Sequence, residues 1–163
     1  MSSLLGLFGV EVVFSVVQTH HKTYSMSQSS ASPRGTRIAH IGIAVPRISE
    51  ILPFYRDILG MSEVQLADSD GAHIGGLVAG ESLVELLEAN APESPIGKFM
   101  AKRGPGLHHI CFAVDDIEAT LERCRNAGIR LIDQVPRLGA EGKRIAFLHP
   151  ASTAGVLVEL SQD

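Results

Sequence analysis

Two histidines and two glutamates occupy matching places in two halves of the sequence. His40 and His109 each lie in a short strand-like run and are 69 residues apart (109 − 40 = 69). Glu85 follows the first histidine by 45 residues (85 − 40), and Glu159 follows the second by 50 (159 − 109), each within an apolar run. A carboxylate centred in an apolar strand is costly to bury unless it is paired or bound to a metal. One histidine and one glutamate from each half therefore predict a shared metal site.

This set of ligands favours a divalent transition metal ion. Neutral imidazole and carboxylate together suit Co²⁺, Mn²⁺, Ni²⁺, Fe²⁺ or Zn²⁺. Four protein ligands on a six-coordinate ion would leave two positions for water or for two substrate oxygens. Taken singly, each histidine or glutamate is more simply explained as a solvated or packed side chain. Their matched placement in two copies is what favours the metal site.

The strands that carry the histidines present small neighbours beside them. Side chains in a strand alternate between its two faces. His40 therefore shares a face with Gly42 and Ala44, and His109 shares a face with Cys111. The small side chains leave room for a ligand on this face. The bulky residues at the intervening positions are expected to pack under helices.

A helix and three strands are expected after each histidine strand. The first helical pattern runs from Ile51 to Leu59 and ends at Gly60, with a late start or a kink at Pro53. The second begins at Asp115 or Asp116 and ends at Gly128. Strand-like runs follow at residues 62–66, 73–78 and 82–87 in the first half, and at 130–134, 144–148 and 156–160 in the second. The order βαβββ, present twice, predicts a duplicated α+β domain whose copies pack together.

The domain boundaries follow from this repeat. We expect one domain at residues 36–163, with a first module at about 36–90, a linking helix at about 94–103 and a second module at about 105–163. Residues 1–35 are expected to be a disordered leader or a miscalled start, since residues 25–35 are rich in Ser, Gln, Pro and Gly. No Lys or Arg precedes Lys22, so the leader has no clear signal or transit peptide.

Charge and cysteine content exclude some functions. The formal net charge of −4 argues against a nucleic-acid groove or an anionic membrane surface, so neither partner is expected. The two cysteines, Cys111 and Cys124, form no CxxC pair, which is typical of a reduced intracellular protein. We therefore expect a cytoplasmic protein, or one of the mitochondrial matrix if the source is eukaryotic.

Several stretches resemble the vicinal-oxygen-chelate (glyoxalase/bleomycin resistance/dioxygenase) superfamily, whose halves are βαβββ modules. Besides the two histidine strands, they are residues 54–60 and 155–159. Within it, residues 93–97, 106–109 with 114–116, and 147–150 resemble the methylmalonyl-CoA epimerase family. The resemblance covers about residues 37–161. It implies a cupped mixed sheet around a metal site, with His40, His109 and Glu159 as ligands and Glu85 as the fourth.

The same resemblance implies an isomerase that interconverts (2R)- and (2S)-methylmalonyl-CoA, in propionate metabolism. Proton abstraction at C2 would give an enolate, with Co²⁺ as the first expected ion and Glu159 as one acid/base. Some family members carry the second carboxylate in the middle strand of the first half, but residues 71–76 contain no acid. His73 is a conceivable substitute. A homodimer is also implied.

An acyl-CoA substrate brings phosphates that need basic partners. Lys143 and Arg144 are candidates for this role, as are three residues near the linking helix, Lys98, Lys102 and Arg103. Two other functions remain open from the sequence. A glyoxalase I-type lactoylglutathione lyase would use the same fold and metal ligands, and a metal-free module would only bind or sequester a small molecule.

Overall fold

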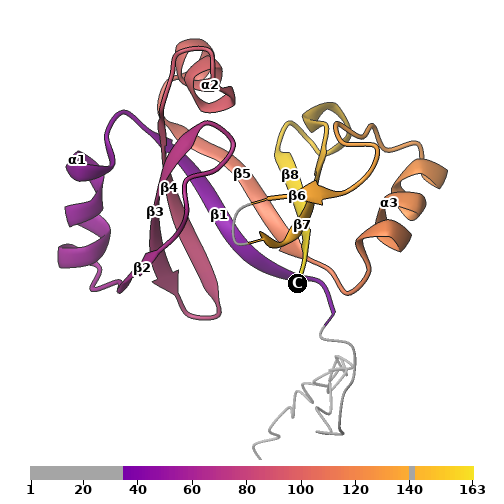
Figure 1. The fold of residues 1–163 in the computed structure, drawn as a ribbon, viewed down its shortest axis with the longest axis horizontal. Helices are drawn as coiled ribbons and strands as arrows, with labels where there is room; N and C mark the ends of the chain where they lie inside the picture. The colour runs from indigo at the N-terminus through magenta and orange to yellow at the C-terminus, as the bar shows by residue number, and fades with distance from the viewer. Residues whose placement is uncertain (1–34, 140–141) are drawn as a thin grey trace, which may run out of the picture. The chain divides into compact units, whose positions relative to one another are not determined.

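The computed structural model describes residues 35–139 and 142–163, so the predicted leader lies outside the described residues except for Gly35. The first module contains β1 (Arg37–Val45), α1 (Ile48–Pro53), a π-helical turn (Phe54–Ile58), β2 (Glu63–Gln65), β3 (Ala72–Ala79) and β4 (Ser82–Ala89). Helix α2 (Pro95–Arg103) leads to the second module (Figure 1). That module contains β5 (Gly106–Ala113), α3 (Ile117–Asn126), β6 (Arg137–Leu138), β7 (Arg144–Leu148), a 3₁₀ turn (Pro150–Ser152) and β8 (Leu157–Gln162).

The eight strands of the described residues form one curled mixed sheet in the order β2-β3-β4-β1-β5-β8-β7-β6. Within each module the first and last strands run parallel, β1 with β4 and β5 with β8. Strands β1 and β5 pair antiparallel and so join the two modules at the centre of the sheet. The sheet order is symmetric about this junction. The prediction of tandem βαβββ modules around a cupped mixed sheet is therefore confirmed.

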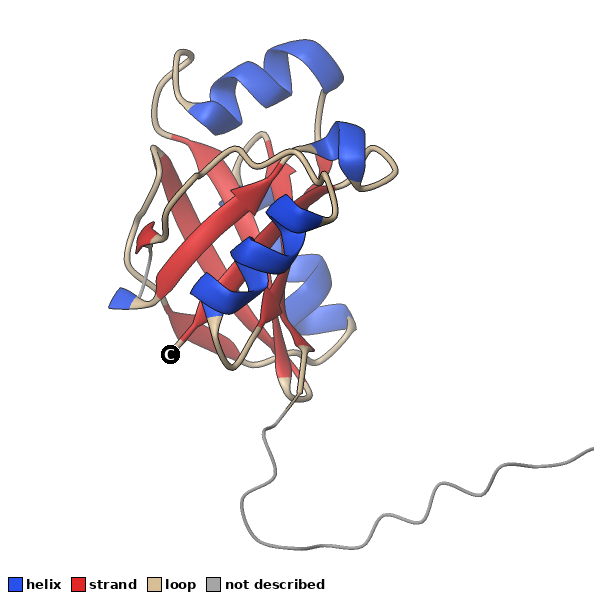
Figure 2. Ribbon diagram, turned by 90° about the vertical axis from the view of Figure 1, so that its right-hand side faces the viewer, coloured by secondary structure: helices blue, strands red, loops and turns tan. Residues whose placement is uncertain are grey.

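The bulky strand faces pack under the helices, as the alternation predicts. In the first module Val45, Leu77 and Leu86 are buried against Ile48 and Ile51 of α1. In the second, buried residues of α3 and of the strands below it form one cluster, which comprises Val114, Ile117, Leu121, Ala146, Leu148 and Leu160. Figure 2 shows the helices outside the layer of strands. The opposite face of the sheet is therefore left for the site.

The linking helix begins where its sequence predicts. The Ser94 side chain accepts a hydrogen bond of 3.1 Å from the Gly97 N–H, and Pro95 occupies the first turn. Serine at the N-cap and proline at the first helical position are favoured for these reasons. Helix α1 begins at Ile48, not late, but its hydrogen-bond pattern changes to the π type directly after Pro53. Proline has no N–H to donate, which accounts for the change at that residue.

The predicted strand at residues 130–134 is wrong. This segment forms only an isolated bridge, between Leu131 and Leu148. The Asp133 carboxylate accepts a hydrogen bond of 2.9 Å from the Phe147 N–H, and the Ile132 and Asp133 N–H groups both donate to the Phe147 carbonyl. Because the Asp133 side chain occupies the Phe147 N–H of β7, residues 130–134 cannot form a longer ladder with that strand. The second strand of this module forms later in the chain, as β6.

Candidate metal centre

The four predicted ligands come from the four central strands of the sheet. His40 lies on β1, Glu85 on β4, His109 on β5 and Glu159 on β8. Gly42 of β1 pairs with both Glu85 and His109, so these three form one row across the sheet. A Cβ atom at Gly42 would lie 2.3 Å from Cε1 of His109. The absence of a side chain there gives the imidazole its place.

The ligand atoms of these side chains lie close together. His40 Nε2 is 2.9 Å from His109 Nε2 and 3.3 Å from Glu159 Oε2. His109 Nε2 is 3.1 Å from the same Glu159 oxygen, and His40 Nδ1 is 3.5 Å from Glu85 Oε1. His40, Glu85 and His109 each offer a ligand atom within 4.8 Å of the others. Two imidazoles and two carboxylates in this arrangement fit a divalent transition metal ion.

Both glutamates are buried, and Glu159 is ionised. Glu85 is 7% exposed, and His109 and Glu159 are each 5% exposed. Burial by itself would raise the pKa of Glu159, but hydrogen bonds from His109 and His40 lower it to about 2. Burial by itself would lower the pKa of His40, but hydrogen bonding with Cys111 and Glu159 and the charge of Glu85 raise it to about 10. Both shifts express the close pairing of imidazole with carboxylate, which gathers the side chains of a cation site around one point.

His108 holds the ring of its neighbour. Its Nδ1 lies 2.9 Å from Nδ1 of His109, and its ring packs edge-to-face on Phe99 of α2 at 4.9 Å between centroids. Burial, and then the charge of His109, lower the pKa of His108 to about 4, so it is a neutral imidazole. With Nδ1 of His109 facing His108, Nε2 faces Glu159 and His40. This is the orientation that a metal ligand requires.

The four side chains line a cavity of about 280 Å³ on the face of the sheet opposite α1 and α3. Of the predicted substrate-binding residues, Lys143 lines this cavity. Arg144 and His73 do not line it. The Arg144 guanidinium binds Glu118 of α3, and His73 is exposed and lies 2.6 Å from the Asp68 carboxylate.

Arg137 is a cavity residue that the sequence did not indicate. Its guanidinium binds Asp70 of the first module at 3.0 Å and lies 3.7 Å from Asp133. It also stands over the ring of Phe147, 5.6 Å from the centroid. Arg137 thus brings a positive charge into the cavity and ties the two modules together. Nothing in its local sequence marks it, because its partner Asp70 is brought to it only by the way in which the modules meet.

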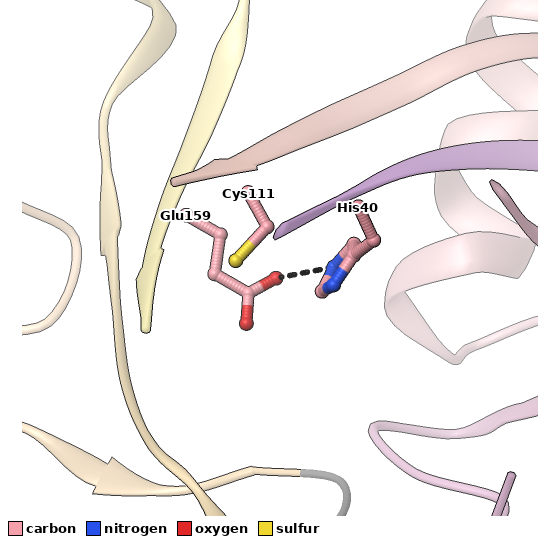
Figure 3. Close-up of side chains that lie close together, drawn as sticks. All are labelled: His40, Cys111 and Glu159. Atoms are coloured by element: carbon pink, nitrogen blue, oxygen red, sulfur yellow. Dashed lines mark ion pairs between the residues drawn. The ribbon is translucent and has the colours of Figure 1, made fainter. Parts of the chain in front are cut away.

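Cys111 lies on the same face as His109 and is fully buried, and burial raises the pKa of its thiol. Figure 3 shows Cys111 between His40 and Glu159, with the three side chains pointing toward one another. These three also offer ligand atoms within 4.8 Å of one another. Sequence reasoning treated Cys111 only as a small apolar lining of the cavity.

Residues 39–147 match the model of the glyoxalase/bleomycin resistance protein/dioxygenase superfamily. The chain belongs to this superfamily. It is 36% identical to the mitochondrial methylmalonyl-CoA epimerase of Mus musculus, over 94% of this chain and 93% of that protein. It is 37% identical to the ethylmalonyl-CoA/methylmalonyl-CoA epimerase of Cereibacter sphaeroides, over 77% of this chain and 97% of that protein. The superfamily and the epimerase homology predicted from the sequence are both confirmed.

Solved structures agree with these relatives. A methylmalonyl-CoA epimerase in complex with methylmalonyl-CoA and NH₄⁺ is 37% identical and superposes with a TM-score of 0.74, covering 78% of this chain and 94% of that one. The methylmalonyl-CoA epimerase of Mycobacterium tuberculosis is 31% identical, also with a TM-score of 0.74, covering 84% of this chain and 93% of that one. Within the described part of the chain, no helix has the length and apolar character needed to cross a membrane.

Proposed function

We propose that this protein is a methylmalonyl-CoA epimerase that interconverts the (2R) and (2S) substrates. One observation carries the proposal. The four residues predicted from the repeat, His40, Glu85, His109 and Glu159, converge in one cavity of a chain homologous to epimerases. A related epimerase of the same fold has been solved with methylmalonyl-CoA.

The same four residues are the proposed metal ligands, with Co²⁺ the first candidate and Mn²⁺, Ni²⁺, Fe²⁺ or Zn²⁺ as alternatives. A divalent ion held there would supply a Lewis acid for the negative charge that develops on the thioester oxygen as the C2 proton leaves. The low exposure of Glu85, His109 and Glu159 leaves little of three of the four ligands open to solvent. His108 fixes the ring of His109 from behind. These contacts hold the protein side of the site in place before substrate arrives.

Glu159 is the proposed carrier of one proton. It is ionised at neutral pH, because its pKa lies near 2, so it is already in the unprotonated form that a base requires. Epimerisation also requires a group on the opposite face of the substrate carbon to return a proton. Besides the proposed ligands, the carboxylates that line the cavity among the described residues are Asp70 and Asp133. Arg137 binds Asp70 and lies beside Asp133, so it would have to release a carboxylate that acts in this role.

The substrate is an anionic acyl-CoA, and Lys143 and Arg137 bring positive charge to the cavity that would receive it. Of the basic residues predicted from the sequence, Lys143 keeps this role in our proposal. Arg144 would first have to leave Glu118, and His73 would have to leave Asp68. We also propose the homodimer, the division into modules at 36–90 and 105–163 joined by residues 94–103, and a cytoplasmic or mitochondrial matrix location.

Hydrogen exchange at the substrate carbon tests the proposal. Cobalt-loaded protein is incubated with one methylmalonyl-CoA epimer in D₂O, and deuterium entry at C2 is followed by mass spectrometry. Rapid exchange is expected, and it should be lost in His109→Ala. The matched control is His149→Ala, because the side chain of His149 only caps a turn by accepting from the Ala151 N–H. Metal binding without exchange, together with turnover of a glutathione hemithioacetal, would instead establish the lactoylglutathione lyase.

A further inference from the structure

Cys111 and the metal ligands lie in two adjacent rows across the sheet. In the first row, Cys111 of β5 pairs with His40 of β1 on one side and with Glu159 of β8 on the other. In the second row, Gly42 pairs with both Glu85 and His109. Together the two rows present two sets of ligand atoms. Within each set, the ligand atoms lie within 4.8 Å of one another. One set is His40, Glu85 and His109, and the other is His40, Cys111 and Glu159.

The two sets differ in their chemical preference. Two imidazoles and a carboxylate suit ions such as Co²⁺ and Mn²⁺, whereas a set containing thiolate selects softer ions. Cys111 is 0% exposed, and its side chain points toward His40 and Glu159 (Figure 3). Imidazole, thiolate and carboxylate from three neighbouring strands are the ligand types that bind Zn²⁺ in proteins.

We propose that Cys111, His40 and Glu159 form a second metal site that binds thiophilic ions such as Zn²⁺ or Cd²⁺. Binding would displace the thiol proton to the buffer and leave a thiolate–metal bond, as cysteine ligands require. This second site shares His40 and Glu159 with the epimerase metal site. An ion held by Cys111 therefore excludes the ion held by Glu85 and His109. Thiophilic metals would therefore compete with the epimerase metal for binding. This competition rests on the proposed function of the first site.

The existence of the second site is tested by spectroscopy, independently of epimerase activity. Metal-free protein is titrated with Cd²⁺, and the thiolate-to-cadmium charge-transfer band in the ultraviolet is recorded. The wild type should develop the band up to one equivalent of Cd²⁺, and Cys111→Ser and Cys111→Ala should not. The matched control is Cys124→Ser, because Cys124 lies on α3 in the core cluster on the other face of the sheet. His109→Ala should keep the band, because His109 belongs only to the first set.

Two results would overturn the inference. One is Cd²⁺ binding by the wild type without a thiolate band, and the other is a band that survives both Cys111 variants or disappears in Cys124→Ser. Circular dichroism checks that both Cys111 variants are folded. The Glu159→Gln variant tests the set of His40, Cys111 and Glu159 without changing the cysteine, and it should weaken the band. Competition completes the test, since bound Cd²⁺ should block Co²⁺ binding in the wild type. The exchange assay with Co²⁺ does not report on sulfur, so it tests the epimerase separately.

Discussion

Gly42→Ala should disable the metal site without altering any ligand. The added Cβ would lie 2.3 Å from Cε1 and 2.5 Å from Nδ1 of His109, whereas ordinary contacts begin at 3.4 Å. The imidazole would have to move by about 1.1 Å (3.4 − 2.3) to relieve the contact. His109 is 5% exposed and is held by His108, Glu159 and Phe147, so it has little free space in which to move.

The size of the effect follows from how narrowly metal bonds are defined. Metal–ligand distances vary by only about 0.2 Å in well-formed sites, so a shift of this size takes His109 out of the coordination sphere. Even changes that only misorient a ligand weaken metal affinity by about 10- to 100-fold. We expect at least that loss for Co²⁺, equivalent to about 1.4 to 2.8 kcal/mol. Alanine is no worse than glycine inside a strand, so the metal-free fold should lose only the cost of displacing the buried imidazole, about 1 to 3 kcal/mol.

A double-mutant cycle checks that the effect passes through His109. Co²⁺ affinity is measured by its absorption spectrum in wild type, Gly42→Ala, His109→Ala and the double variant. Once His109 is gone, the added methyl group has nothing to displace, so Gly42→Ala should cost little further affinity. Unchanged Co²⁺ binding in Gly42→Ala, or losses that simply add in the double variant, would refute the reasoning.

Three further predictions concern removal of the metal, proton release when the metal binds, and the affinity for substrate. Stripping the metal with a chelator should lower Tm in calorimetry, since an ion present at about 100 times its Kd stabilises by about 2.7 kcal/mol; an unchanged Tm would contradict a bound ion. His40 has a pKa near 10 without metal and must lose its proton to bind, so affinity should rise with pH. Calorimetry in buffers of different ionisation enthalpy should show proton release at neutral pH, and none would contradict this role. Arg137→Gln should raise KM by about threefold to tenfold with little change in kcat. The reason is that Asp70 and Asp133 would then face the anionic substrate without a neutralising charge. Arg125→Gln on α3 is the control.

The repeat was readable in the sequence because its signals are local. Alternation of side chains within a strand, helix stops at Gly60 and Gly128, and the matched histidines and glutamates each depend on a few neighbouring residues. The prediction of a strand at residues 130–134 was wrong because the contact that decides this segment is not local. Its composition suits a strand, but the Asp133 side chain takes the N–H of Phe147 that a ladder would have used. That contact joins segments 14 residues apart, and local propensity carries no information about it.

Sequence alone determined the two modules and the types and positions of the four proposed ligands, because the duplication repeats one histidine and one glutamate in matching strands of each half. Tertiary structure alone decided how the modules meet. The antiparallel register of β1 and β5 places Gly42 beside His109 and Cys111 beside His40. The contact between modules also puts Arg137 on Asp70, 67 residues away in the chain. Pairing between distant strands is set by the packing of whole faces, so no short stretch of sequence specifies which side chains share a row.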